Sequence, residues 1–346
     1  MLFVLTLVLV TGVYRMAKQK VLVKNMQAVE GLGHAQVIVI DKTGTLTRNE
    51  MIVSHLFVGG HTIIVSGKGY YSEGSLFLNG KSVVVEPGTD LYLLAQGLRL
   101  LNTSTITFVD QRGTFDIKGD PTEAALFIVA QKVTINEQDL AGYKKIYEIP
   151  FDSEYRYHAA FYEYNGQGIA FIVGSPEAIA QRAKKTAPDT IVQEFLHDGL
   201  RLVVVAIKKF DIKLIPVKSS DQEQLLFFHT LIDKDLITIG LCGIEDSIRP
   251  EAISTISKAR KAGLQIIMAT GDHQRTALSI AKQVGIYKDG DEAIDGSELS
   301  KMSDAQLEEV IIHATVFSRV TPDQKLRIIS ALHKRGLTVA MTGDGI

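Results

Sequence analysis

The sequence is most constrained by an aspartate placed directly after a short, wholly apolar segment. Val37-Ile38-Val39-Ile40 is a β-branched run of the kind buried on both faces of a sheet, and Asp41-Lys42-Thr43-Gly44-Thr45-Leu46-Thr47 follows it. Ligands of open α/β sheets bind outside the carboxyl ends of such strands. An aspartate there is ionised at pH 7 and can attack phosphorus without a general base. The alternative is an ordinary turn, since Asp, Thr and Gly are common after strands.

The same arrangement recurs twice more. Ala269-Thr270-Gly271-Asp272 follows the apolar run 264–268, and Met341-Thr342-Gly343-Asp344-Gly345 follows 337–340. Between them lies Lys325, in the segment Thr321-Pro322-Asp323-Gln324-Lys325. Taken singly, Lys325 fits an exposed helix face and residues 270–272 fit a helix cap.

In this order, the motifs resemble those of the P-type cation-transporting ATPases, members of the haloacid dehalogenase superfamily, over essentially the whole chain. The resemblance implies that Asp41 attacks the γ-phosphate of ATP and becomes an aspartyl phosphate. It implies a Mg²⁺ site formed by Asp41, the Thr43 carbonyl and Asp344, whose hard oxygen atoms suit that ion. It further implies that Thr270 and Gly271 donate hydrogen bonds to the phosphoryl group and that Lys325 neutralises it. Asp272 is expected either to brace the loop or to contact the nucleotide-bound metal.

The resemblance also implies a nucleotide-binding domain. Glu123, in Lys118-Gly119-Asp120-Pro121-Thr122-Glu123, is expected near the adenine amino group, and Phe151, in Pro150-Phe151-Asp152-Ser153, is expected to stack on adenine. Arg201 is expected to reach the phosphates, and Arg156 takes the place of a basic residue that follows the Phe segment. One departure concerns a Lys-Gly-Ala-Pro-Glu motif, which is Val173-Gly174-Ser175-Pro176-Glu177 here.

Strand and helix patterns predict the fold class α/β, with a Rossmann-like phosphorylation domain of the haloacid dehalogenase type interrupted by an inserted α+β nucleotide-binding domain. Short β-rich runs, including 62–65 and 82–85, suggest hairpins in the insertion. Asp246-Ser247-Ile248-Arg249-Pro250 resembles the segment where the chain re-enters the first domain. We expect the domains at 1–16 (end of a transmembrane helix), 17–50 and 238–346 (phosphorylation domain, truncated at its C-terminus) and 51–237 (nucleotide-binding domain).

The N-terminal segment suggests a membrane. Residues 1–13 are apolar apart from two threonines and one glycine, and the basic residues Arg15, Lys18, Lys20 and Lys24 follow. The run is too short to span a bilayer, which needs about 20 residues, so we interpret it as the end of a longer helix whose following chain is cytoplasmic. A buried helix of a soluble protein is the alternative.

Three functional classes fit these motifs. The favoured one is the catalytic core of an ATP-driven cation pump, most similar to the group that moves Ca²⁺ or Na⁺/K⁺; Ca²⁺ is favoured, with its ligands outside this chain. The second is a soluble phosphatase with a large cap, but such enzymes usually carry a second aspartate where Thr43 lies, to activate water. The third is a non-catalytic nucleotide-binding remnant.

Composition excludes other classes. The 37 Lys and Arg residues nearly balance 39 Asp and Glu residues, which argues against nucleic acid as a partner. The lone Cys242 has no partner for an internal disulfide, and the scattered histidines indicate no zinc site. Residues 74–82 imitate a phosphate-binding loop, but five residues separate the glycines instead of four, so we predict a hairpin turn.

Overall fold

The computed structural model describes residues 2–109, 114–133, 135, 137–216 and 220–343. The chain forms two compact units. The first unit combines residues 1–48 with 248–346, and the second consists of residues 49–247. The second unit extends to residue 247 because β13 (Leu236–Ile248) belongs to its sheet almost to the end of the strand.

The first unit is built on a five-stranded sheet in which every pairing is parallel. In spatial order the strands are β15 (Glu292–Asp295), β16 (Ala314–Ser318), β14 (Gln265–Ala269), β1 (Val37–Ile40) and β17 (Val339–Thr342). The apolar run of the sequence analysis therefore forms β1, between β14 and β17, as expected of a strand buried on both faces.

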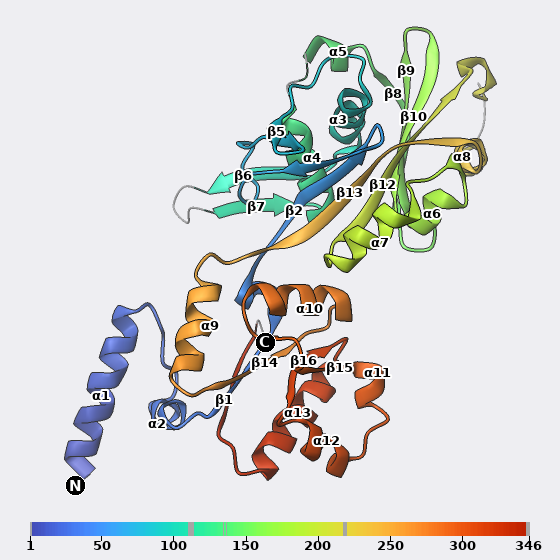
Figure 1. Cartoon of the computed structure of the whole chain (residues 1–346). Helices are drawn as coiled ribbons and strands as arrows, with labels where there is room; N and C mark the ends of the chain where they lie inside the picture. The colour runs from blue at the N-terminus through green and yellow to red at the C-terminus, as the bar shows by residue number, and fades with distance from the viewer. Residues whose placement is uncertain (1, 110–113, 134, 136, 217–219, 344–346) are drawn as a thin grey trace. The chain divides into compact units, whose positions relative to one another are not determined.

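Helices cover both faces of this sheet (Figure 1). They are α9 (Ala252–Lys261), α10 (Gln274–Gln283), α11 (Gly296–Leu299), α12 (Asp304–Val310) and α13 (Pro322–Lys334). Val37 and Val39 share an apolar cluster with residues of α12 and α13, whereas Ile38 and Ile40 share one with α9 and α10. The alternation of side chains along β1 thus joins the two helical layers through the sheet.

The N-terminal segment forms two helices, α1 (Leu2–Lys18) and α2 (Gln27–Gly33). The sequence pattern predicts one helical stretch over residues 15–33, and this prediction is wrong. α1 ends at Lys18, just before Lys20, whose left-handed φ of 63° does not continue a helix. Among the described residues, no helix is both long enough and apolar enough to cross a bilayer.

The second unit contains a large, mainly antiparallel sheet. Its main path runs through β5 (Lys81–Ser82), β4 (Leu76–Leu78), β3 (His61–Val65), β2 (Thr47–Val58), β13, β12 (Arg201–Phe210), β10 (Gln167–Gly174), β9 (Tyr157–Tyr164) and β8 (Lys144–Asp152). The short strand β11 (Ala183–Lys185) pairs with β13, and β6 (Thr105–Val109) with β7 (Thr114–Lys118) forms a separate hairpin. Residues 74–82, whose sequence imitates a phosphate-binding loop, contain the predicted hairpin, in which β4 and β5 are joined by a turn at Asn79 and Gly80.

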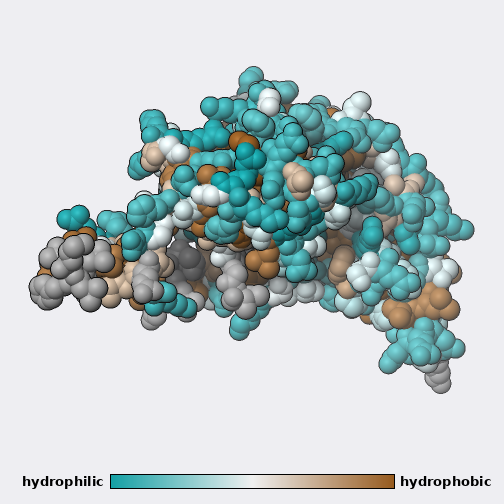
Figure 2. Space-filling view, turned by 90° about the horizontal axis from the view of Figure 1, so that it is seen from below, coloured by the Kyte–Doolittle hydropathy of each residue, from teal (hydrophilic) through white to brown (hydrophobic). Residues whose placement is uncertain are grey.

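Two helical layers cover this sheet as well (Figure 1). Residues of α3 (Asp90–Leu101) and α4 (Pro121–Gln131) share an apolar cluster with one face, and residues of α6 (Pro176–Ala180), α7 (Asp189–His197) and α8 (Asp221–Ile232) share one with the other. The remaining helices are α5 (Glu137–Ala141) and the single turn Ile212–Leu214. The face of the molecule in Figure 2 is mostly hydrophilic, as expected when the apolar residues lie in such cores.

Candidate active site

Two of the three acidic loops lie together at the carboxyl ends of the parallel strands. Asp41 follows β1 and its N–H donates to the Thr342 carbonyl, 3.0 Å away, on β17. Ile40 pairs with Met268 of β14, so the loop 270–272 begins beside the loop of Asp41. Asp344 lies outside the described residues, and with it one of the three predicted metal ligands.

Asp41 forms an ion pair with Lys325. Lys325 lies in the first turns of α13, which starts with Pro322 and a capping box in which Thr321 and Gln324 exchange side-chain and backbone hydrogen bonds. The Asp41 side chain is 23% exposed, so the carboxylate stays accessible while the ammonium group is held against it. A carboxylate next to a fixed cation is suited to accept a phosphoryl group, whose charge the cation can stabilise.

Thr270, Asp272 and Lys42 form a second polar group at this edge. The Thr270 hydroxyl donates to Asp272 Oδ2 at 2.8 Å, and the Asp272 N–H donates to Thr270 Oγ1 at 3.2 Å. Lys42 Nζ lies 2.9 Å from Asp272 Oδ2. Thr270 is buried and Gly271 is exposed, and a Cβ at Gly271 would meet the Val320 carbonyl oxygen at 4.0 Å. The arrangement orders the loop and leaves the Gly271 backbone open.

Arg249, where the chain returns to the first unit, holds the loop after Asp41 in place. Arg249 Nη2 donates to the Gly44 carbonyl at 2.9 Å and Arg249 Nε donates to the Thr47 carbonyl at 3.1 Å. The Arg249 N–H donates to the Leu46 carbonyl at 2.9 Å. Gly44 has a φ of 72°, a conformation that favours glycine, so the sharp turn after Thr43 depends on this residue.

Lys42 and Arg249 are residues of this site for which the sequence analysis assigned no role. Lys42 lies inside the Asp41 motif, and its 3% exposure shows that it is not a solvated surface lysine. Arg249 was noted only as part of the re-entry segment. A basic residue next to a candidate nucleophile was the available signal, but nothing in the sequence indicated its partner 230 positions away.

The described oxygen atoms are compatible with Mg²⁺. Asp41, Asp272 and the Thr43 carbonyl belong to the two adjacent loops, and hard oxygen ligands supplemented by water and phosphate are what Mg²⁺ prefers. Within the described part of the chain no group of three or more His, Cys, Asp or Glu side chains is gathered for a metal ion.

A separate cavity of about 450 Å³ lies in the second unit. It brings together the four side chains that the sequence analysis assigned to nucleotide binding: Glu123, Phe151, Arg156 and Arg201. They come from α4, β8, the turn after β8 and the start of β12. The volume is in the range of small-molecule sites, and apolar walls with a few polar groups are typical of them.

The wall at Phe151 is shaped by a tight turn. Asp152 Oδ1 accepts from the N–H groups of Glu154 and Tyr155, at 2.7 and 3.3 Å, and Arg156 closes the turn with a φ of 57°. Phe151 is 60% exposed, although large aromatic side chains are usually buried. An exposed ring at the mouth of a cavity, with two arginines beside it, is suited to stack on a flat heterocycle and to attract an anion.

The back of the cavity contains a histidine between two glutamates. His158, on β9, is 2% exposed; its Nδ1 lies 3.1 Å from Glu123 Oε1 and its Nε2 lies 2.9 Å from Glu148 Oε1. The contact to Glu123 is short but is not aligned as a hydrogen bond, so it is an ion pair. Burial alone would lower the pKa of His158, but the two carboxylates outweigh burial and raise it above 6.5.

The pKa values of Glu123 and Glu148 are shifted downward, opposite to that of His158. Burial would raise the pKa of Glu123, but His158 and the Thr103 hydroxyl, which donates to Glu123 Oε2 at 2.6 Å, bring it below its usual value. The pKa of Glu148 is lowered, against its own burial, by Lys145 and His158. All three shifts favour the charged form of the group. Val173, where the resembled motif has a lysine, lines the same cavity.

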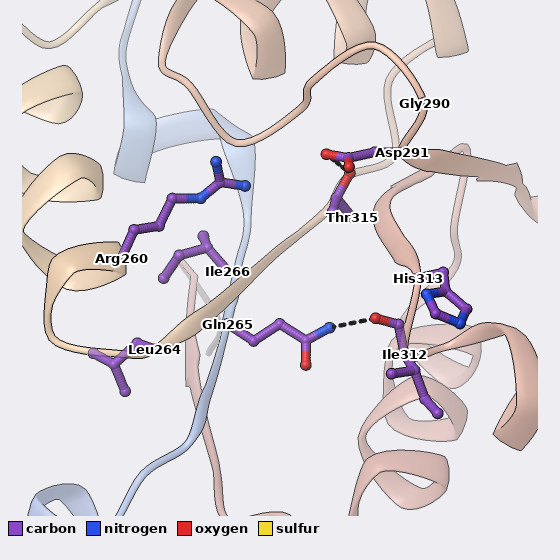
Figure 3. A pocket seen from close by; sticks show the side chains of 9 residues that line it. All are labelled: Arg260, Leu264, Gln265, Ile266, Gly290, Asp291, Ile312, His313 and Thr315. Atoms are coloured by element: carbon purple, nitrogen blue, oxygen red, sulfur yellow. Dashed lines mark hydrogen bonds between the residues drawn. The ribbon is translucent and has the colours of Figure 1, made fainter.

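The first unit also has a hollow, which lies at the opposite ends of the strands from Asp41. Figure 3 shows it at the amino ends of β14, β15 and β16, where Gln265 Nε2 donates to the Ile312 carbonyl at 3.2 Å and Arg260 and Asp291 point toward the opening. It contains none of the predicted site residues. The motifs and the geometry therefore both indicate the carboxyl ends of the strands, beside Asp41, as the candidate active site.

Comparisons with known proteins agree with the motifs. Residues 90–251 match the family model described as P-type ATPase, cytoplasmic domain N. The chain is 35% identical to a calcium-transporting ATPase of Bacillus subtilis, over 99% of this chain and 39% of that protein. It is also 35% identical to a cation-transporting ATPase of Synechocystis, over 99% and 39%, and to a calcium-transporting ATPase of Lactococcus lactis, over 99% and 37%.

The chain therefore spans about two fifths of the length of these relatives. The matched segment, the order of the motifs and the names of the relatives point to one conclusion: the chain belongs to the family of P-type ATPases.

Proposed function

We propose that this chain is the phosphorylation and nucleotide-binding part of an ATP-driven cation pump, in which Asp41 accepts the γ-phosphoryl group of ATP. The observation that carries the proposal is the pairing of Asp41 with Lys325 beside the loop of Thr270 and Asp272. We assign the first unit, with its parallel sheet interrupted after β1, to the haloacid dehalogenase type of phosphorylation domain.

The chemistry follows from these side chains. An oxygen of the Asp41 carboxylate forms a bond to the γ-phosphorus while the bond from that phosphorus to the β,γ-bridging oxygen breaks, and ADP leaves with the electron pair. Lys325 would lie beside the charge that spreads over the phosphoryl oxygens, and the Thr270 hydroxyl and Gly271 N–H would donate to them. A bound Mg²⁺ would neutralise part of the same charge.

The second unit would hold the nucleotide. Phe151 would stack on adenine, Glu123 would accept from its amino group, and Arg156 and Arg201 would attract the phosphates. All four line one cavity, which supports a common ligand. Thr43 favours a pump over a phosphatase, because no carboxylate occupies the position from which such enzymes activate water.

Transport would require segments beyond those described. Relatives named as calcium-transporting ATPases favour Ca²⁺ as the cation. Side chains of α1 such as Leu7, Val8 and Val10 are exposed, which supports contact between this helix and a membrane, with the two units on the cytoplasmic side.

Incubation with Mg²⁺ and γ-labelled ATP tests the proposal. We expect label that survives acid quenching, is released by hydroxylamine and is absent from Asp41→Asn. Asp289→Asn makes the same change at an exposed site of the same unit and should retain the label. Label that persists in Asp41→Asn would contradict the assignment, and steady release of phosphate from small esters would favour the phosphatase.

A further inference from the structure

The nucleotide cavity contains a charge network, centred on the buried His158, that neither the motifs nor the comparisons assign. It runs from Lys145 through Glu148 and His158 to Glu123, and ends at the Thr103 hydroxyl. Its members come from β8, β9, α4 and the loop after α3. His158 and Glu123 line the cavity, whereas Glu148 and Lys145 do not.

The position of His158 explains why this network matters for binding. In the pairing of β9 with β10, His158 lies directly opposite Val173, so both side chains occupy the same face of the sheet, which is the face toward α4 and Glu123. Val173 contributes no charge there. Arg156 and Arg201 are exposed, so His158 is the buried side chain lining this cavity that can carry a positive charge.

The network also restricts the orientation of the Glu123 carboxylate. Its Oε2 accepts from the Thr103 hydroxyl, and its Oε1 faces the His158 ring. A partly buried carboxylate is costly when no cation lies beside it. A charged His158 offsets this cost and fixes the orientation of the Glu123 carboxylate through the ion pair. A neutral His158 would weaken the ion pair and leave the ionised carboxylate free to turn away from the base.

Building on the proposed function, we propose that His158 is a positioning residue for base recognition, which holds Glu123 as an anionic acceptor so that the cavity prefers bases carrying an exocyclic amino group at this edge. Adenine carries such a donor, whereas hypoxanthine carries a carbonyl oxygen in its place, which a carboxylate repels. Glu123 would contact the base, and His158 would act through Glu123.

The preference should depend on pH. The charged groups around His158 are Glu123 from α4, Glu148 from β8 and, lining the same cavity, Asp120, Arg156 and Arg201. The pKa of His158 is raised above 6.5, so the preference should be complete below about pH 6.5 and decline as the pH rises through the raised value.

The test compares binding of ATP and ITP to the full chain by calorimetry, between about pH 6 and pH 8, the range in which a histidine titrates. The two nucleotides carry the same triphosphate, so the ratio of their Kd values cancels phosphate titration. We expect the wild type to prefer ATP by about tenfold at the lower pH, with the preference shrinking as the pH rises. In His158→Gln the preference should be small and independent of pH.

Glu148→Gln provides a variant outside the cavity. Removing one carboxylate should lower the pKa of His158, so the decline of the preference should move to lower pH while ATP binding at the lowest pH is retained. Proton NMR of the His158 ring should show the same shift of its titration.

Two results would overturn the inference in different ways. A wild-type ATP/ITP ratio and pH profile retained in folded His158→Gln, or unmoved by Glu148→Gln, would reject the role of His158 and leave the nucleotide site intact. Wild-type protein that binds neither nucleotide would reject the role of His158 together with the nucleotide site on which it rests.

Discussion

Phe151 is an exposed aromatic residue whose exposure a ligand would explain. Its ring is 60% exposed at the mouth of a cavity. Stacking of a base on an aromatic ring contributes about 1–3 kcal/mol. We predict that Phe151→Ala weakens ATP binding by about tenfold, measured by calorimetry, without lowering the midpoint of urea unfolding. Phe108→Ala removes another exposed ring of the second unit and should leave ATP affinity unchanged; equal losses in both variants would contradict the stacking role.

Lys42 gives a prediction about stability. Its ammonium group is buried and pairs with Asp272 at 2.9 Å. Lys42→Met keeps the apolar stem but leaves the Asp272 carboxylate without this partner, which should lower the free energy of unfolding by about 1–3 kcal/mol, because Asp272 is partly exposed. Urea unfolding measures the change. Lys301→Met, at an exposed position of the same unit, serves as the control; an equally small effect in both would show that the pair contributes little.

The sequence predicted the candidate residues of the cavity better than it predicted their partners. The motifs named Glu123, Phe151, Arg156 and Arg201, and the fold brings all four to one cavity. His158 has no motif, and its importance depends on Glu148 and Glu123, which reach it through strand pairing and helix packing. Contacts of this kind are set by the tertiary structure, so a single sequence does not reveal them.

At the scale of elements, the loop from Asp41 to Thr47 depends on Arg249. One guanidinium group donates to the carbonyls of both Gly44 and Thr47. A lysine keeps the charge but cannot make both bonds in this fixed geometry. We predict that Arg249→Lys slows labelling of Asp41 by γ-labelled ATP and leaves the Kd for ATP unchanged.

The control for this loop is Arg335→Lys, which makes the same exchange at an exposed arginine near the end of α13. It should label at the wild-type rate. Wild-type labelling in Arg249→Lys would show that the loop is held without the arginine, and a weakened Kd would show an effect outside the loop.

Strands that coincide with apolar runs could be predicted from the sequence, whereas strands whose length depends on a partner strand could not. The runs at 37–40 and 62–65 form β1 and lie within β3. The run at 82–85 was predicted as a strand, but β5 ends at Ser82, because its partner β4 begins at Leu76 and leaves nothing for Val84 to pair with. The start of α8 depends on a local hydrogen-bond pattern instead, the capping box that Ser220 and Glu223 form.

At the scale of the whole molecule, the nucleotide cavity belongs to a unit with its own apolar cores. Two large clusters fill the second unit, one on each face of its sheet, and all side chains that line the cavity fall between residues 49 and 247. We predict that residues 49–247 expressed alone fold cooperatively and bind ATP with nearly the affinity of the full chain. Circular dichroism and calorimetry test this. A folded segment that does not bind ATP would show that the cavity is insufficient.

The central claim is that Asp41 carries the phosphoryl group, and mapping the modification by mass spectrometry tests it most directly. The full chain is incubated with Mg²⁺ and ATP, quenched in acid, digested with a protease active at low pH and analysed by peptide sequencing. The account predicts a phosphate on the peptide that contains Asp41, at that aspartate, and none in Lys325→Met, which lacks the paired cation. Phosphate on any other residue, or none on Asp41 in protein shown to bind ATP, would contradict it.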